Sequence, residues 1–315
     1  MTSEFPAVSV LLPTYNGAKT LHRAIMSILQ QSFQDWELII VDDGSTDETS
    51  IIISSFSDSR IRATKHENNQ GLVQALRTGT KLCTASLIAR QDQDDVSHKD
   101  RLLIQTRYLV DHPQIGIVGT WAEVIDDTNV KEGRQTKYLR HPRHHGNIRW
   151  LALFNNPFVH SSVVIRREIL ESLGGYSDTS PLTPPEDYEL WSRLLNTQLA
   201  ANIPQSLITY QQTAIGMSSK QGRKIRDNAH QIALRNISML MSRPTSDIDS
   251  LFIQVMNGNF QSRIKVSESF KIDANMFKYF RQLRKRQIMP GYPMLLKSLI
   301  RNHISFFQCL FARPK

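Results

Sequence analysis

The chain is poor in cysteine and has no long uninterrupted apolar run. Cys83 and Cys309 are its two cysteines, and they lie too far apart for a zinc or dithiol motif. We therefore expect no disulfide framework and a reducing, cytoplasmic compartment. No stretch reaches the roughly 18–20 apolar residues of a membrane-spanning helix, and the first residues lack the apolar core of a secretion signal. The composition, 40% apolar and 21% charged, is that of a globular protein.

Acidic residues are scarce in the C-terminal part. Residues 261–315 hold twelve Lys or Arg and two Asp or Glu, so the net charge of +9 belongs to this tail. Within it, 276–288 and 293–315 combine basic with apolar residues, a pattern typical of helices that lie in an anionic membrane interface. A packed helical subdomain is the alternative. We expect no nucleic-acid partner, because the tail has no recognisable readout module and its aromatics do not interleave as stacking platforms.

Apolar strands alternate with amphipathic helices over the first two-thirds of the chain. This alternation predicts an α/β fold with a mostly parallel sheet flanked by helices. A polar loop is expected at 126–147, and a basic helical region from 216 onward. We expect strands at 8–16, 36–43, 60–66, 85–92, 115–125 and 207–213, with helices at 18–32, 48–58, 70–83, 99–113 and 184–196 and a strand followed by a short helix within 156–176.

Three of the expected strands end in polar or acidic residues, namely Thr14-Tyr15-Asn16, Asp42-Asp43 and Asp92-Gln93-Asp94-Asp95. Ligands of parallel sheets bind beyond the carboxyl ends of the strands, so these ends predict one site. Carboxylates that crowd together repel one another and need a cation or a shared proton. The alternatives are an acidic surface turn and, for Asp42-Asp43, a turn with a helix cap at Ser45 or Thr46.

Four motifs follow one another over residues 8–200. They read VSVLLPTYNGAKT…VDDGSTDET, NNQGL, IARQDQDDVSHKDRLLIQ and GGY…PEDYELWSRLL. In this order they resemble the family-2 glycosyltransferases. The resemblance implies a Rossmann-like GT-A domain over 1–215, followed by a basic helical region over 216–315. It also implies an inverting transfer of a sugar from a nucleotide-sugar, expected to be a UDP-sugar, to a glycan or lipid-linked acceptor in cell-surface polysaccharide assembly.

On the donor side, the resemblance assigns roles to the three strand ends. Tyr15 would stack on the base, and Asp42 would accept a hydrogen bond from uracil N3–H. A buried core aromatic is the alternative for Tyr15. The donor-binding set is Pro13, Thr14, Tyr15, Asn16, Asp42, Asp43 and Asp92.

The acidic DxD pattern at Asp92 and Asp94 implies a divalent cation. Carboxylate oxygens suit Mn²⁺ or Mg²⁺, and such a cation would stabilise the diphosphate leaving group. Asp92 would touch the sugar or ribose and could share the metal with Asp94. Asp95 could take either role.

On the acceptor side, the resemblance makes Asp187 the catalytic base, with Glu186 beside it. A carboxylate can take the proton of the attacking hydroxyl. Acids at a helix start are also favoured by the helix dipole alone, which is the alternative reading. His160 and Trp191 are placed near the acceptor, although a buried structural histidine is equally expected. Arg77 stands where many relatives have Asn, which leaves its role open.

Other functions fit the sequence less well. The DQDDV stretch resembles the first motif of haloacid-dehalogenase-type phosphatases, but Arg90 and Gln91 interrupt its strand and no Gly-Asp pair follows. A nucleic-acid-binding protein and a catalytically inactive sugar-nucleotide-binding relative remain alternatives. The Gln-x-x-Arg-Trp motif of processive synthases is absent, which favours the addition of one sugar per event.

Overall fold

The computed structural model describes residues 5–126, 137–212, 222–258 and 266–285. The chain folds as two compact units. The first comprises Met1–His141, Phe158–Pro181 and Asn196–Gly222, and the second Pro142–Pro157, Leu182–Leu195 and Arg223–Lys315. The second unit thus takes two short segments from the middle of the chain. The division between 215 and 216 stays a prediction of the sequence.

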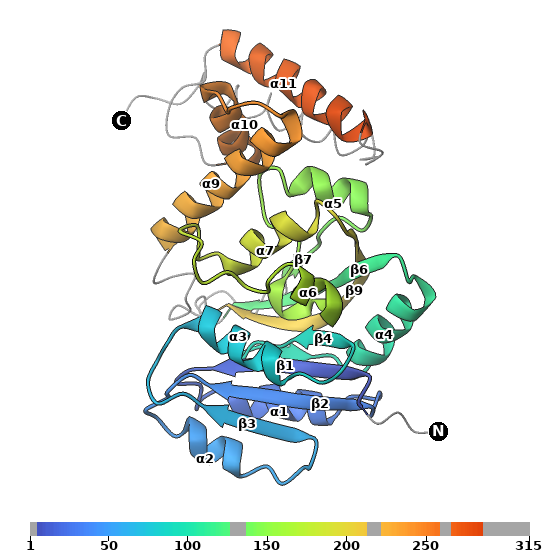
Figure 1. Ribbon diagram of the computed structural model, residues 1–315, viewed down its shortest axis with the longest axis vertical. Coiled ribbons are helices and arrows are strands. Elements are labelled where there is room, and N and C mark those ends of the chain that lie inside the picture. The colour runs from blue at the N-terminus through green and yellow to red at the C-terminus, as the bar shows by residue number, and fades with distance from the viewer. Residues whose placement is uncertain (1–4, 127–136, 213–221, 259–265, 286–315) are drawn as a thin grey trace. The chain divides into compact units, whose positions relative to one another are not determined.

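In the described part of the first unit, nine strands form one sheet with the order β3-β2-β1-β4-β8-β6-β9-β5, and β7 pairs with β6 (Figure 1). The sheet is parallel from β3 to β4 and between β6 and β9, and antiparallel around β8, β7 and β5. The expected α/β fold is confirmed, with a mixed sheet. The strands are β1 (Val8–Thr14), β2 (Trp36–Asp42), β3 (Ile61–Lys65), β4 (Leu87–Arg90), β5 (Val96–Ser97), β6 (Ile115–Asp126), β7 (Lys137–Leu139), β8 (Val164–Arg166) and β9 (Leu199–Gln212).

Helices cover both faces of the parallel strands. Strands β1 and β2 are buried throughout, which explains their nearly continuous apolar sequence. Val10 and Leu12 belong to the same core cluster as α1 and α4, whereas Leu11 faces α3, where Gly79 leaves room for it. Figure 1 shows α1 and α3 on opposite sides of the sheet. The helices of this unit are α1 (Leu21–Leu29), α2 (Thr49–Ser54), α3 (Leu72–Leu82), α4 (Arg101–Asp111) and α6 (Arg167–Ser172), with a 3-10 turn η2 (His160–Ser162).

The second unit is helical around an aromatic core. Trp150 of α5 and Phe252 of α10 pack edge to face with ring centroids 6.3 Å apart, and Phe280 of α11 lies 6.0 Å from Trp150. Helix α5 begins inside the expected polar loop 126–147, of which 127–136 lie outside the described residues. The helices of this unit are α5 (His145–Leu151), α7 (Glu186–Leu194), α9 (Gly222–Met241), α10 (Asp247–Asn257) and α11 (Val266–Lys285).

The apolar face of α11 is part of this core. Met276, Tyr279 and Leu283 are fully buried, so the apolar side of residues 276–285 packs against protein. Here the alternative reading of a packed subdomain is the one observed. The second expected amphipathic stretch, 293–315, lies outside the described residues. No helix among the described residues is long and apolar enough to cross a membrane.

Candidate active site

Three loops meet at one edge of the sheet, beyond the ends of β1, β2 and β4. Gln93 joins the loop after β4 to the loop after β1, since its Oε1 accepts hydrogen bonds from the Thr14 hydroxyl at 2.6 Å and the Tyr15 N–H at 2.9 Å. The Asp43 N–H donates to the Thr14 carbonyl at 2.8 Å. Because β4 continues the sheet on the opposite side of β1 from β2, this edge is a topological switch point, where α/β sheets bind ligands.

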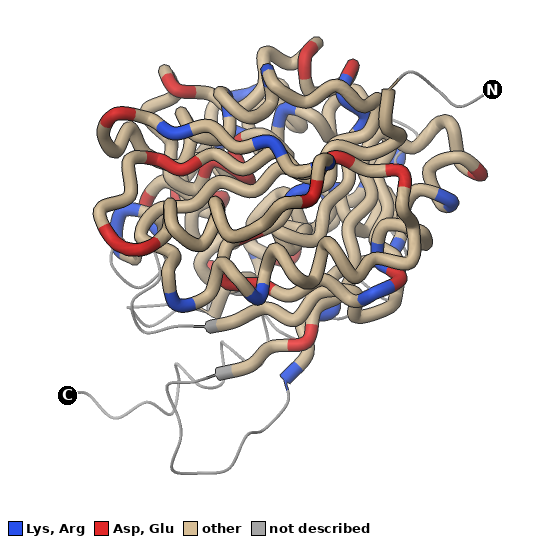
Figure 2. Tube along the Cα trace, turned by 90° about the horizontal axis from the view of Figure 1, so that it is seen from below, with Lys and Arg blue, Asp and Glu red and all other residues tan. Residues whose placement is uncertain are grey.

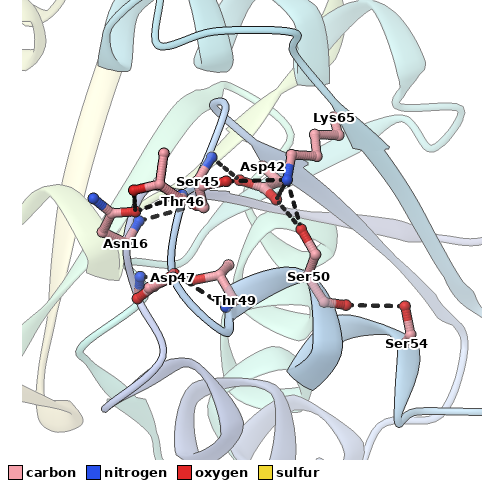
Figure 3. Close-up of polar contacts among 10 residues, drawn as sticks. Asn16, Asp42, Ser45, Thr46, Asp47, Thr49, Ser50, Ser54 and Lys65 are labelled. Carbon is pink, nitrogen blue, oxygen red and sulfur yellow. Dashed lines mark hydrogen bonds and ion pairs between the residues drawn. The ribbon is translucent and has the colours of Figure 1, made fainter.

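The loop after β1 has a left-handed residue at its turn. Asn16 has a φ of +48°, a conformation that Asn tolerates better than most residues. Its N–H donates to Ser45 Oγ at 3.0 Å, and its Oδ1 accepts the Thr46 N–H at 2.9 Å (Figure 3). Ser45 and Thr46 therefore fasten this loop and do not cap a helix, because α2 begins at Thr49. Tyr15 is 43% exposed, which excludes the core-aromatic alternative.

Asp42 is almost fully buried and holds the next loop together. Its carboxylate accepts the Ser45 N–H and the Ser50 hydroxyl, both at 2.8 Å, and Lys65 Nζ lies 3.5 Å away (Figure 3). Burial alone would raise the pKa of Asp42, but these hydrogen bonds and Lys65 outweigh it, so the pKa is lowered. Its contact with uracil stays a prediction.

Asp43 ties the end of β2 to the NNQGL motif. Its carboxylate accepts the N–H groups of Gln70 at 3.0 Å and Gly71 at 2.8 Å, and lies 2.7 Å from His66 Nδ1. Gly44, with a φ of +73°, approaches this segment so closely that a Cβ would lie 2.4 Å from the Asn68 carbonyl carbon. The structure thus gives Asp43 a role in shaping the loop, and its contact with the donor stays a prediction.

The three acids after β4 occupy different environments. Asp95 is fully buried, and its carboxylate accepts hydrogen bonds from the Ser161 hydroxyl and, at 3.0 Å, from the Gln211 N–H. Burial and the neighbouring carboxylates of Asp92 and Asp94 raise the pKa of Asp95 well above its ordinary value. Asp95 therefore anchors the loop to η2 and β9, and its part in binding the metal or the sugar stays a prediction.

Asp92 and Asp94 lie nearer the surface. Asp92 forms an ion pair with Arg90 at 2.6 Å. Burial and the Asp92 carboxylate raise the pKa of Asp94 to about 6. Within the described residues, no other residue donates a hydrogen bond to the Asp94 carboxylate. Its backbone carbonyl accepts a hydrogen bond from Arg23 at 3.3 Å.

These two carboxylates fit a divalent cation. Mg²⁺ and Mn²⁺ are commonly held by one or two carboxylates, with water and substrate phosphates completing the shell. No cluster of three or more His, Cys, Asp or Glu arranged to hold a metal occurs in the described part of the chain. The protein would then supply Asp94 and Asp92, and the donor diphosphate would supply further oxygen ligands.

Two buried arginines beneath the acids were not foreseen as part of the site. Arg101 of α4 is fully buried and donates to Gln91 at 3.1 Å, to Ser97 at 2.9 Å and to the Arg90 carbonyl at 2.8 Å. Arg90, 2% exposed, pairs with Asp92. A charged residue inside an otherwise apolar strand was the sequence signal for Arg90. Together these cations offset part of the repulsion among the acids.

His160 and Arg77 both contact the segment after Gly174-Gly175. His160 Nε2 lies 2.9 Å from the Tyr176 hydroxyl. Arg77 of α3 donates to the Tyr176 carbonyl at 2.9 Å, and its Nε lies 3.3 Å from Asp178 Oδ2. Arg77 therefore fastens this segment to α3. The acceptor role of His160 stays a prediction.

In the second unit, Asp187 lies in the first turn of α7. Its Oδ2 accepts a hydrogen bond from Asn156 Nδ2 at 2.6 Å. Glu186 is mostly buried beside it, and its predicted role also stays a prediction. Trp191 is 0% exposed, so its ring lies in the interior, and its predicted place on the acceptor side stays a prediction. Sequence reasoning missed Asn156, whose NNP context has no helical or strand periodicity.

Comparison with known proteins shows a family match and several relatives of this chain. The family model described as glycosyl transferase family 2 matches residues 9–174. The putative glycosyltransferase EpsE of Bacillus subtilis is 34% identical over 191 residues, which are 60% of this chain and 66% of EpsE. The amylovoran biosynthesis glycosyltransferase AmsE of Erwinia amylovora is 32% identical over 206 residues, 64% of this chain and 74% of AmsE.

A third relative is named for its reaction. The UDP-Glc:α-D-GlcNAc-diphosphoundecaprenol β-1,3-glucosyltransferase WfgD of Escherichia coli is 27% identical over 222 residues, 70% of this chain and 82% of WfgD.

Two solved structures share the fold. Residues 1–349 of S. aureus TarS, in complex with UDP-GlcNAc, superpose with a TM-score of 0.58 at 14% identity, covering 96% of this chain and 90% of that one. The mannosyltransferase PcManGT of Pyrobaculum calidifontis, with GDP-Man and Mn²⁺, gives 0.55 at 16% identity, covering 99% and 89%. These likenesses show the GT-A fold.

Proposed function

This chain belongs to glycosyltransferase family 2, and from that premise we propose that it is an inverting, metal-dependent enzyme. It transfers one sugar from a UDP-sugar to a glycan or lipid-linked acceptor in bacterial cell-surface polysaccharide assembly. The observation that carries the proposal is the junction of three loops at the switch point, with an exposed Tyr15 on one loop and Asp94 on another.

The relatives support the choice of substrates. TarS has been solved with UDP-GlcNAc, and WfgD is named for UDP-Glc, which favours UDP over other nucleotides. PcManGT was solved with GDP-Man and Mn²⁺, which keeps GDP as the second nucleotide to test. WfgD is named for an acceptor attached to a lipid diphosphate, and AmsE for polysaccharide biosynthesis. Both names favour a lipid-linked glycan as the acceptor.

In the proposed reaction the acceptor hydroxyl attacks the anomeric carbon from the face opposite the diphosphate, which inverts the configuration. Asp187 takes the hydroxyl proton as the new C–O bond forms. The bond from the anomeric carbon to the phosphate oxygen breaks, and its electron pair leaves with the diphosphate. A divalent cation held by Asp94 and Asp92, when bound, supplies Lewis-acid stabilisation of that charge. The Tyr15 ring stacks on the nucleobase, and the backbone from Pro13 to Asn16 lines the ribose side.

We extend the proposal to the membrane, because a lipid-linked acceptor lies there. The outward face of α11 exposes two aromatic rings, Phe270 at 68% and Phe277 at 52%. Basic side chains surround them on that face, and a basic face with exposed aromatic rings suits an anionic bilayer at the inner, cytoplasmic side. These exposed basic residues are Lys271, Lys278, Arg281, Arg284 and Lys285.

Calorimetric titration of the full chain with UDP tests the proposal. We expect binding that is tighter with Mn²⁺ than without it, and loss of the Mn²⁺ effect in Asp94→Asn. Asp111→Asn, which changes an exposed acid at the end of α4, is the matched control and should behave as wild type. If neither UDP nor GDP binds with Mn²⁺, the transferase proposal fails.

A non-catalytic sugar-nucleotide-binding protein is the competing function. It would show the same calorimetric result but no metal-dependent release of UDP from a UDP-sugar. In the proposed enzyme, Asp187→Asn abolishes the release of UDP from the UDP-sugar. The substitution leaves UDP binding intact, because the catalytic carboxylate acts on the acceptor and does not contact the nucleotide.

A further inference from the structure

The carboxylate of Asp187 is held by hydrogen bonds on both oxygens, and the two donors come from different segments of the second unit. Its Oδ1 accepts the N–H of Tyr188 at 2.6 Å, within the first turn of α7. Its Oδ2 accepts the side-chain amide of Asn156 at 2.6 Å. A donor from its own helix leaves the carboxylate able to rotate about its side-chain bonds, and the second donor removes that freedom.

The turn that carries Asn156 is itself anchored. The carbonyl oxygens of Ala152 and Phe154 accept hydrogen bonds from side chains on three helices, and Pro157 restricts the backbone of the residue before it. The three donors are Tyr188 of α7 at 2.9 Å and Asn236 of α9 at 2.7 Å, both to Ala152, and Asn257 of α10 at 2.7 Å, to Phe154. The amide of Asn156 is therefore presented from a fixed backbone.

We propose that Asn156 is a positioning residue for sugar transfer, whose amide keeps the Asp187 carboxylate in the orientation that receives the acceptor proton. This inference rests on the proposed function, in which Asp187 is the base. A carboxylate has about four lone-pair positions, so one donor on each oxygen leaves room for the acceptor hydroxyl. Because a misplacement of about 1 Å can lower a rate about 10²-fold, the expected effect of losing Asn156 is on turnover.

A purely structural bridge would behave differently. If Asn156 only joined the turn to α7, its removal would lower the melting temperature and leave kcat and KM of the folded protein unchanged. A fall in kcat at unchanged KM in the folded variant therefore separates positioning from structural support. An isosteric variant separates the effect of losing the hydrogen-bond donor from the effect of changing the side-chain shape.

The test uses the full chain with Mn²⁺ and measures UDP release from UDP-glucose and UDP-N-acetylglucosamine, and GDP release from GDP-mannose. A synthetic GlcNAc-diphosphate-lipid serves as acceptor. Asn156→Ala removes the side chain, and Asn156→Asp keeps its shape but removes the donor. Gln231→Ala is the control, because Gln231 is an exposed carboxamide side chain on α9, away from the turn that carries Asn156.

We expect kcat to fall about 10- to 100-fold in Asn156→Ala and at least as far in Asn156→Asp, which sets a second carboxylate beside the base. KM for the donor should stay within about twofold in both variants, because the proposed role of Asn156 is limited to orienting Asp187. Gln231→Ala should keep both constants within about twofold of wild type.

Wild-type kcat in Asn156→Asp overturns the inference, and so does a folded Asn156→Ala with unchanged kcat. If Asn156→Ala fails to fold, the isosteric variant still decides. An inactive Asp187→Asn beside a fully active Asn156→Ala removes the inference and leaves the proposed function standing. No turnover by the wild-type chain with any of the three donors, or full turnover by Asp187→Asn, removes both.

Discussion

A nucleobase needs a flat apolar surface, and an exposed aromatic ring beside a polar site supplies one. Tyr15 lies directly after β1, and its backbone N–H is held by Gln93. We predict that Tyr15→Ala weakens UDP binding by about 1–3 kcal/mol, the range found for bases stacked on aromatic side chains. Calorimetry measures the change, with Tyr138→Ala, an equally exposed tyrosine of β7, as the control. Unchanged affinity would exclude stacking on Tyr15.

The Arg101 side chain is expected to contribute strongly to the free energy of unfolding. Its guanidinium is fully buried and donates five hydrogen bonds, to side chains of Gln91, Ser97 and Gln105 and to two backbone carbonyls. We predict that Arg101→Leu lowers the free energy of unfolding by about 3–5 kcal/mol, because it leaves the buried acceptors of these five hydrogen bonds without their donor.

Urea unfolding measures the effect of Arg101→Leu. Arg107→Leu is the control, because Arg107 lies on the same helix and is exposed. Its loss should change stability by less than about 0.5 kcal/mol. Equal effects of the two variants would contradict the prediction.

The sequence located the acids of the site but could not distinguish their environments. Asp95 is set apart by Ser161 and Gln211, which lie 66 and 116 positions further along the chain. No local pattern reports such a pairing, because it depends on which strands become neighbours in the sheet. The Asn156 amide, 31 positions before Asp187, was missed for the same reason.

Long elements with clear periodicity were predicted well, and short ones were not. The expected helices at 18–32 and 99–113 appear as α1 and α4, because both carry a repeating apolar face. Strands β5 and β7, of two and three residues, are too short to show any alternation. Strand β9 begins at Leu199, earlier than the expected 207, and its pairing with β6 contains register shifts that break the period.

Helices α10 and α11 are joined by a buried carboxylate. Asp249 accepts hydrogen bonds from the Arg243 guanidinium at 2.8 and 2.9 Å, from the Ser246 N–H at 2.7 Å, and from the Tyr279 hydroxyl. Burial alone would raise the pKa of Asp249, but these donors outweigh it and lower the pKa to about 2. The charged form is therefore more stable in the folded protein than in the unfolded chain.

This lowered pKa predicts acid sensitivity of the second unit. The contribution of Asp249, about 2 kcal/mol, is fully present above about pH 4 and is lost as the pH falls toward 2. Urea unfolding at pH 5, 4 and 3 should show a steeper loss of stability in wild type than in Asp249→Asn. Asp247→Asn, an exposed acid of the same helix, should retain the wild-type slope, and the same slope in all three proteins would refute the prediction.

For the molecule as a whole, charge is distributed unevenly along the chain. Lys and Arg positions are interspersed with Asp and Glu over most of the described chain (Figure 2). Helix α11, in contrast, holds five Lys or Arg and two Asp or Glu. We predict that the full chain binds vesicles containing phosphatidylglycerol at low salt and detaches as salt rises. Phosphatidylcholine vesicles should not retain it.

Variants on the outward face of α11 test this surface in a vesicle flotation assay. Lys278→Gln with Arg281→Gln should weaken binding about tenfold or more, at about 1 kcal/mol per basic residue. Phe277→Ser should weaken it further, whereas Met239→Ser, a half-exposed apolar residue of α9, should not. A full chain that stays unbound at low salt would end the membrane proposal.

The second unit, assembled from three separate stretches of chain, sets an order for biosynthesis. Trp150 and Phe154 leave the ribosome about a hundred residues before Phe252, their partner in the aromatic core. At about 5–20 residues per second, synthesis of the residues between Phe154 and Phe252 takes roughly 5–20 s. During that interval their apolar surface is available to chaperones. A fragment that ends near residue 215 would lack Phe252 and would leave the aromatic core of the second unit incomplete.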